Sequence, residues 1–146
     1  MKADPINVIP KSALVPGVLG LMPVVFLTAV IIHQAPKVHA ETLTALLAYG
    51  AVILSFLAGV RWGLVISGSS QLPFVFEFGI VVLPPLAGWG SILIEKPAGF
   101  LVLSISFSLL LLMDCIISGA PRWYLRLRVI LSLPVITCLL VVLSVQ

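Results

Sequence analysis

Residues 43–66 read LTALLAYGAVILSFLAGVRWGLVI, an apolar run of 24 residues with one charged side chain, Arg61. A helix needs about 20 apolar residues to cross a bilayer core about 30 Å thick, so this run is long enough to span it. The strands of a membrane barrel alternate polar and apolar residues, and this run does not. The stretch therefore predicts a transmembrane helix with an arginine inside its apolar segment.

The whole 146-residue chain shares this character, because 61% of its residues are hydrophobic, 9% are charged and its mean hydropathy is +1.27. Soluble domains are about 45–50% apolar and about 25% charged, which excludes a soluble enzyme. Four more segments have spanning length: 13–32, 74–94, 99–118 and 129–145. The links between them are short, so neighbouring helices should run antiparallel. We therefore predict one all-α domain over residues 1–146, a polytopic membrane bundle of five transmembrane helices.

Five crossings place the two ends of the chain on opposite sides of the membrane. Five basic residues fall on the N-terminal side of the expected bundle: Lys2, Lys11, Arg122, Arg126 and Arg128. Lys37 and Lys96 fall on the other side. Lys and Arg collect on the cytoplasmic side of membranes. We therefore expect a cytoplasmic N-terminus and an outer C-terminus, in a bacterial cytoplasmic (inner) membrane or, in a eukaryote, the mitochondrial inner membrane.

Three ionisable residues fall inside the apolar segments: Arg61, Glu77 and Asp114. A charge at the centre of a membrane helix costs about 2.5–3.5 kcal/mol on insertion scales. Residues that bear this cost usually face the bundle interior, pair with one another and mark a functional site. At 1.5 Å per residue, all three lie roughly 5–10 Å below the inner surface. We predict that Arg61 pairs with Asp114, with Glu77 close by.

This intramembrane charge cluster has three interpretations. A pair can fix the packing and orientation of the helices, which is the preferred interpretation. The charges can also line a pathway for a proton, an ion or a ligand, although a paired arginine argues against a proton relay because Arg does not deprotonate. Finally, Arg61 and Glu77 can each reach water independently along their own side chains.

A stripe of small residues recurs every four positions along the second segment: Ala51, Ser55, Gly59 and Gly63. Small residues at this spacing let another helix backbone approach closely. The stripe predicts close helix packing, either inside the bundle or against a different chain or a second copy.

The link before the last segment carries aromatic and basic residues in one cluster: Arg122, Trp123, Tyr124, Arg126 and Arg128. Trp and Tyr favour the headgroup level of a bilayer, and arginines favour lipid phosphates. We expect this cluster at the membrane interface, in contact with anionic lipids or with a partner subunit.

The sequence lacks the patterns that are typical of catalytic or cofactor sites. It has no Ser/His/Asp arrangement, phosphate-binding loop or haem motif in a supporting context. His33, His39 and Glu41 are scattered, which is weak support for a metal site. Eight basic residues are too few for a nucleic-acid surface. We therefore expect no enzymatic activity, no cofactor, no metal and no nucleic-acid partner.

Two stretches carry a family resemblance: residues 49–63, YGAVILSFLAGVRWG, and Asp114 followed by residues 121–128, PRWYLRLR. They resemble a family of unknown function, with bacterial and mitochondrial members, typified by transmembrane protein sixty-nine. That family typically shows YGA-x-x-LSFLGG, then a basic residue and Trp-Gly, so Ala58 replaces the first glycine of its pair. The resemblance implies a multi-helix membrane architecture and no particular reaction.

Two functions fit these features. The preferred one is an accessory or assembly subunit of a membrane energy-converting complex, respiratory or photosynthetic, because five short-looped helices leave apolar faces for lipids, other membrane subunits or self-association. The alternative is a small carrier or channel for a proton, a lipid or a quinone-like molecule, with Glu77 and Arg61 along its path.

Overall fold

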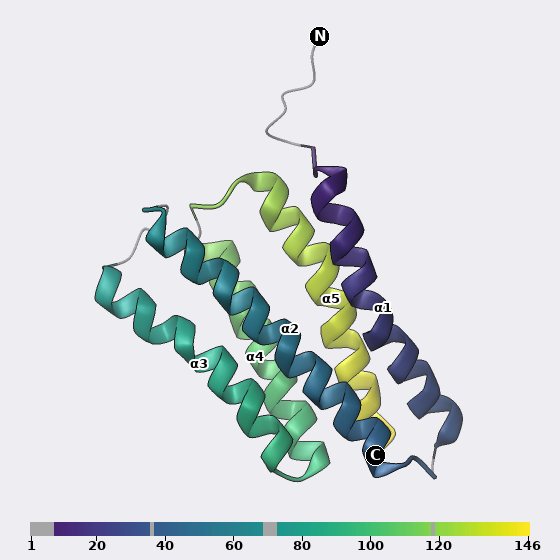
Figure 1. Cartoon of the computed structure of the whole chain (residues 1–146). Helices are drawn as coiled ribbons and strands as arrows, with labels where there is room; N and C mark the ends of the chain where they lie inside the picture. The colour runs from purple at the N-terminus through teal and green to yellow at the C-terminus, as the bar shows by residue number, and fades with distance from the viewer. Residues whose placement is uncertain (1–7, 36, 69–72, 118) are drawn as a thin grey trace.

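The computed structural model describes residues 8–35, 37–68, 73–117 and 119–146, which form helices and contain no strand (Figure 1). The helices are α1 (Lys11–Gln34), α2 (Ala40–Ile66), α3 (Phe74–Leu93), α4 (Lys96–Ile117) and α5 (Arg122–Ser144). All five are long and apolar enough to cross a membrane. The predicted all-α architecture with five spanning helices is confirmed.

Several helices begin earlier than the apolar segments predict. The largest difference is in α5, which begins at Arg122 and not at residue 129, about two turns earlier. Pro121 stands at its N-cap, a position where the missing N–H of proline is not needed. The first seven residues of α5 include three arginines, which lower the local hydropathy. A prediction from apolar segments therefore starts this helix too late. Lys2, and Ser118 at the expected end of the fourth segment, lie outside the described residues.

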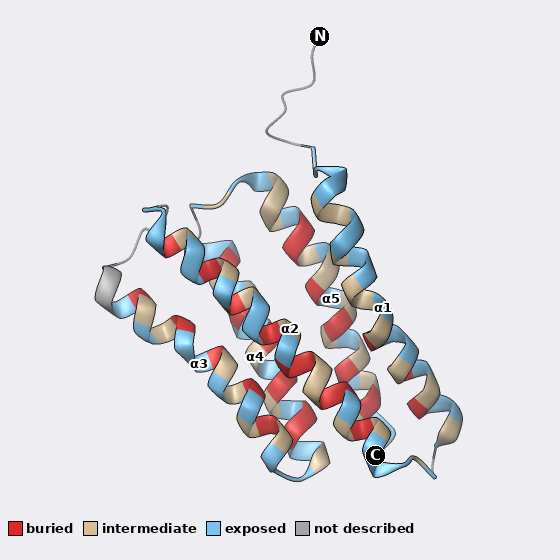
Figure 2. Ribbon diagram, viewed as in Figure 1, coloured by how far each residue is buried: buried red, intermediate tan, exposed pale blue. Residues whose placement is uncertain are grey.

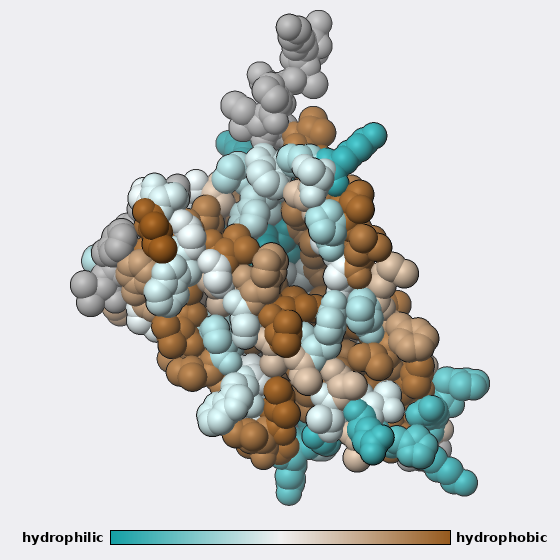
Figure 3. Space-filling view, in the orientation of Figure 1, coloured by the Kyte–Doolittle hydropathy of each residue, from teal (hydrophilic) through white to brown (hydrophobic). Residues whose placement is uncertain are grey.

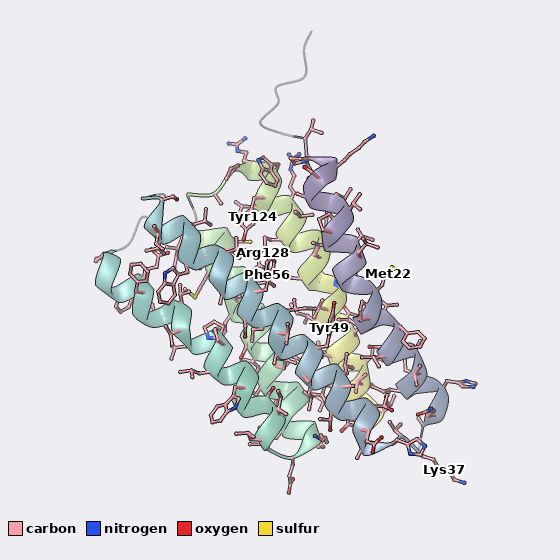
Figure 4. The ribbon with its side chains drawn as sticks, in the orientation of Figure 1. Met22, Lys37, Tyr49, Phe56, Tyr124 and Arg128 are labelled. Atoms are coloured by element: carbon pink, nitrogen blue, oxygen red, sulfur yellow. The ribbon has the colours of Figure 1, made fainter. Side chains whose placement is uncertain are left out.

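The helices form an antiparallel bundle in which α2 contacts α1, α3 and α4, while α5 contacts α4 and α1. Figure 1 shows that α1, α3 and α5 begin at the end of the bundle where α2 and α4 finish. We call this the basic end, because Lys11 and Arg122 are the first residues of α1 and α5. Lys37 lies at the opposite end (Figure 4).

The core lies where α2, α4 and α5 face one another, and buried residues follow these facing sides (Figure 2). Its largest apolar members include Leu46, Leu54, Phe100, Phe107 and Leu139, all at most 1% exposed. The outer surface is also apolar (Figure 3), with side chains such as Phe26 and Trp89 more than half exposed. An apolar outer surface is what a helix bundle presents to lipid.

The small-residue stripe of α2 does not form an interface inside the chain along its whole length. Ala51 is buried against α3, where a Cβ built on Gly88 would lie 3.2 Å from the Ala51 Cβ. Ser55, Gly59 and Gly63 are exposed, and no described atom lies within 4 Å of a Cβ built on either glycine. Each step of four residues rotates the side-chain direction by about 40° around the helix axis. The stripe therefore faces α3 at Ala51 and the outer surface at Gly59 and Gly63.

Candidate functional site

Arg61 is the centre of a buried charge network near the basic end of the bundle. It lies on the inward face of α2 and is 1% exposed. Its Nη2 donates to Glu77 Oε1 of α3 at 2.7 Å, and its Nη1 donates to Asp114 Oδ1 of α4 at 3.1 Å. Nη1 also lies 3.3 Å from the Met113 carbonyl oxygen, to which it donates. The structure thus brings together the three charges that the sequence predicts to lie at one level.

Arg128 is the fourth member of the network. Its Nε donates to Asp114 Oδ2 at 2.6 Å, and its Nη2 forms an ion pair with the same oxygen at 2.6 Å. Arg128 is buried inside the bundle, with 4% of its surface exposed, so it faces Asp114 and not the outer surface of the bundle. Its predicted level at the membrane interface stays a prediction. Because α5 already begins at Arg122, Arg128 lies on the same inward face as Ser132 and Val135, four and seven positions later.

The four charges form the chain Glu77–Arg61–Asp114–Arg128, with one residue from each of α3, α2, α4 and α5. Two guanidinium groups and two carboxylates cancel in formal charge. An isolated ion in an apolar interior is very costly, and it is retained there only when it is paired and hydrogen-bonded. Each of the four side chains needs a partner of opposite charge from another helix. The network therefore holds α2, α3, α4 and α5 in contact with one another.

Three polar atoms beside these pairs are buried without a hydrogen-bond partner among the described residues: Arg61 Nε, Glu77 Oε2 and the Tyr124 hydroxyl. Glu77 therefore binds through one oxygen only, whereas Asp114 uses both. Asp114 is the more heavily engaged carboxylate of the two.

The other members of the predicted interfacial cluster lie closer to the surface. Arg122 and Arg126 are exposed, and Trp123 and Tyr124 are half-buried. The Trp123 and Tyr124 rings meet edge to face, with their centroids 6.2 Å apart. Figure 4 shows Tyr124 on α5 between Arg128 and the basic end.

A groove of about 360 Å³ lies beside the network, between α1, α2 and α5, and Phe107 of α4 also lines it. Its walls are apolar except for Arg128 and Ser132. Figure 3 shows a hydrophilic spot inside a hollow on this face, at the place where Figure 4 labels Arg128. Sequence reasoning missed this groove, because no sequence pattern reports how far α1 and α2 diverge.

Metal-binding geometry does not occur within the described part of the chain, where no three His, Cys, Asp or Glu side chains gather closely enough to hold an ion. The network itself supplies two acids, but each already has an arginine as its partner. Pairing of this kind neutralises the formal charges of buried side chains.

Comparison with known proteins finds one matching family and relatives that are named as transmembrane proteins. Residues 9–144 match the model of a family described as Protein of unknown function (DUF3429). Transmembrane protein 69 of Xenopus tropicalis is 33% identical over 129 residues, which cover 84% of this chain and 50% of that protein. Transmembrane protein 69 of Mus musculus is 28% identical over 129 residues, covering 85% and 52%.

The chain spans about half the length of the curated relatives that it matches. No solved structure matches it. The resemblance predicted from residues 49–63 and 121–128 is confirmed by these matches.

Proposed function

Because this multi-pass membrane chain belongs to the family described as Protein of unknown function (DUF3429), we propose a function from its geometry: it is a non-catalytic accessory or assembly subunit of a membrane energy-converting complex, respiratory or photosynthetic. The observation that carries this proposal is the buried charge network of Glu77, Arg61, Asp114 and Arg128. Both carboxylates are held by guanidinium groups from other helices. Such a network fixes the relative positions of four helices, which suits a rigid scaffold.

The outer face of α2 supports a role in assembly. Gly59 and Gly63 are exposed, and nothing described lies within 4 Å of a Cβ built on either. Exposed glycines one turn apart let a helix of another chain approach its backbone closely. Trp62 beside them is 41% exposed and adds apolar contact area. We therefore place the partner subunit on this face.

Membrane and orientation follow from the charges at the two ends of the bundle. Lys11 and Arg122 are exposed at the basic end, whereas Lys37 and Glu41 are exposed at the other. By the positive-inside rule, the basic end faces the cytoplasm of a bacterium or the matrix of a mitochondrion. The proposed location is the corresponding inner membrane.

The test is purification of the tagged full chain from its native membrane in a mild detergent. We expect a larger complex with subunits in fixed stoichiometry on a native gel. Gly59→Leu should release those subunits, because its side chain blocks the outer face of α2. Gly79→Leu is the matched control, since Gly79 is exposed on α3 and its Cβ would also meet nothing within 4 Å. A chain that migrates alone, or equal release by both variants, would contradict the subunit role.

A second candidate function is a small carrier for a lipid or a quinone-like molecule. The groove between α1, α2 and α5 favours it, because the groove is apolar and has one basic residue, Arg128, in its wall. Reconstitution in vesicles with a fluorescent lipid on one leaflet measures such transport directly. We expect no acceleration of lipid exchange if the chain is only a subunit.

A further inference from the structure

We propose that the groove between α1, α2 and α5 holds one acyl chain of an anionic phospholipid, with the lipid phosphate at the basic end of the bundle. The inference names a ligand class for the second candidate function and rests on the same groove. It requires binding only, so it stands whether or not the lipid is transported.

The walls of the groove match a hydrocarbon chain. Gly20 and Pro16 of α1, Phe56 of α2 and Leu131 of α5 all line it. Phe56 is 68% exposed, so the groove opens sideways to the surrounding lipid. Its volume of about 360 Å³ is in the range of about 300–1,000 Å³ that is usual for small-molecule sites. An apolar guest can therefore enter from the bilayer without crossing water.

Two contacts of α1 define the shape of the groove. The Tyr49 hydroxyl of α2 donates to the Gly20 carbonyl oxygen at 2.9 Å. On the other side, a Cβ built on Gly17 would lie 2.5 Å from Leu131 Cδ1, so α1 is already in close contact with α5 there. A Cβ built on Gly20 itself meets no described atom within 4 Å, so the space beside this residue is open. Phe56 lines the groove and lies about two turns after Tyr49 along α2, which runs toward the basic end, so the groove lies on the basic side of the Tyr49 contact.

The charges at the basic end select an anionic headgroup. Arg128 lies in the wall of the groove, and Lys11 and Arg122 are exposed where α1 and α5 begin. Lys and Arg bind lipid phosphates by charge-assisted hydrogen bonds. Arg128 is already neutralised by Asp114, so Lys11 and Arg122 supply the unbalanced positive charge.

A quinone-like ring fits this site less well. A quinone carries two carbonyl acceptors on opposite sides of its ring, whereas Arg128 and Ser132 lie four positions apart on one helix face and are the polar members of the wall. The second carbonyl would lie against apolar carbon without a donor, which is costly in a buried site. An acyl chain has no hydrogen-bond acceptor in its hydrocarbon part, so it needs no donor from the wall of the groove.

The experiment uses the full chain in nanodiscs of phosphatidylcholine with a small fraction of phosphatidylglycerol that carries a photoreactive group in the middle of its acyl chain. After illumination, peptide mapping should find adducts in residues 13–21 and 127–135. Gly20→Leu should reduce these adducts to the level found on outer surfaces, because its side chain fills the groove. Gly79→Leu is the matched control and should label like the parent.

The headgroup is tested with the same photoreactive acyl chain on phosphatidylcholine. We expect weaker labelling of the groove by this neutral probe. Lys11→Gln and Arg122→Gln should each reduce the preference for phosphatidylglycerol about fivefold. Both residues are exposed, so these variants test the inference even where Gly20→Leu impairs folding.

Three outcomes would overturn the proposal. The first is an even spread of adducts over all outward helix faces. The second is equal labelling of the groove by the neutral and the anionic probe in the parent chain. The third is displacement of the photoreactive lipid by a short-chain quinone but not by excess phosphatidylglycerol. Labelling of the groove in a chain that fails to accelerate lipid exchange would support the inference and exclude the carrier function.

Discussion

Asp114 on α4 and Arg128 on α5 are joined through one carboxylate oxygen, Oδ2, which lies 2.6 Å from both Nε and Nη2 of the guanidinium. The second oxygen of Asp114 accepts from Arg61 of α2. One carboxylate with no solvent exposure therefore forms ion pairs with two buried cations from two other helices. This arrangement makes Asp114 the residue on which the network depends most.

Asp114→Asn should destabilise the chain strongly. The substitution leaves Arg61 and Arg128 buried with only Glu77 as an anion, and breaking a buried pair in this way costs about 3–5 kcal/mol. Denaturant titration in detergent micelles measures the free energy of unfolding. Glu95→Gln is the matched control, because Glu95 is exposed between α3 and α4 and should change this free energy by less than about 0.5 kcal/mol. Equal effects of both variants would show that Asp114 is not paired.

Arg61 and Glu77 should show coupling in a double-mutant cycle. Arg61→Met leaves Glu77 as an uncompensated buried anion, while Asp114 keeps Arg128, so we expect a loss of about 3–5 kcal/mol. Adding Glu77→Gln removes that anion. The double variant should therefore be more stable than the sum of the single effects predicts, by about 0.5–3 kcal/mol. Strict additivity would mean that the two side chains do not interact.

The number of helices and the level of three charges could be predicted from the sequence because both depend on simple lengths. Apolar runs of spanning length define the helices, and the fixed rise per residue converts position into depth. These relations place Arg61, Glu77 and Asp114 at one level without any knowledge of how the helices pack.

Arg128 and the groove could not be predicted in this way. Arg128 belongs to a short cluster of charged and aromatic residues, and hydropathy alone assigns such a cluster to a loop. The structure begins α5 at Arg122, and it is the burial of Arg128 and its ion pair with Asp114 that show this side chain to point inward. The groove depends on how α1 packs against α2 and α5, through contacts such as that of Tyr49 with Gly20, and the period of a single helix does not reveal such contacts.

Two helical glycines should respond to alanine with opposite signs. A methyl group at Gly99 would overlap the main-chain oxygen of Ser91 on α3, and main-chain atoms cannot move aside without shifting a helix. Overpacking of this kind costs about 1–3 kcal/mol. Gly79→Ala meets nothing within 4 Å and should stabilise α3 by about 0.5–1 kcal/mol, since alanine favours a helix more than glycine does. Unfolding titrations of both variants check this contrast, and a gain at Gly99 would contradict close packing of α3 on α4.

The two tyrosines should also differ when their hydroxyl groups are removed. The Tyr49 hydroxyl donates to the Gly20 carbonyl oxygen across the α1–α2 contact, so Tyr49→Phe should cost about 0.5–1.5 kcal/mol of unfolding free energy. The Tyr124 hydroxyl is buried without a partner among the described residues, so Tyr124→Phe removes an unsatisfied polar group and should be neutral or stabilising. Thermal unfolding of the two variants, side by side in one detergent, provides the comparison. A larger loss for Tyr124→Phe than for Tyr49→Phe would show that the Tyr124 hydroxyl has a partner, and its nearness to Arg128 would make a bound lipid phosphate or water the first candidate to examine.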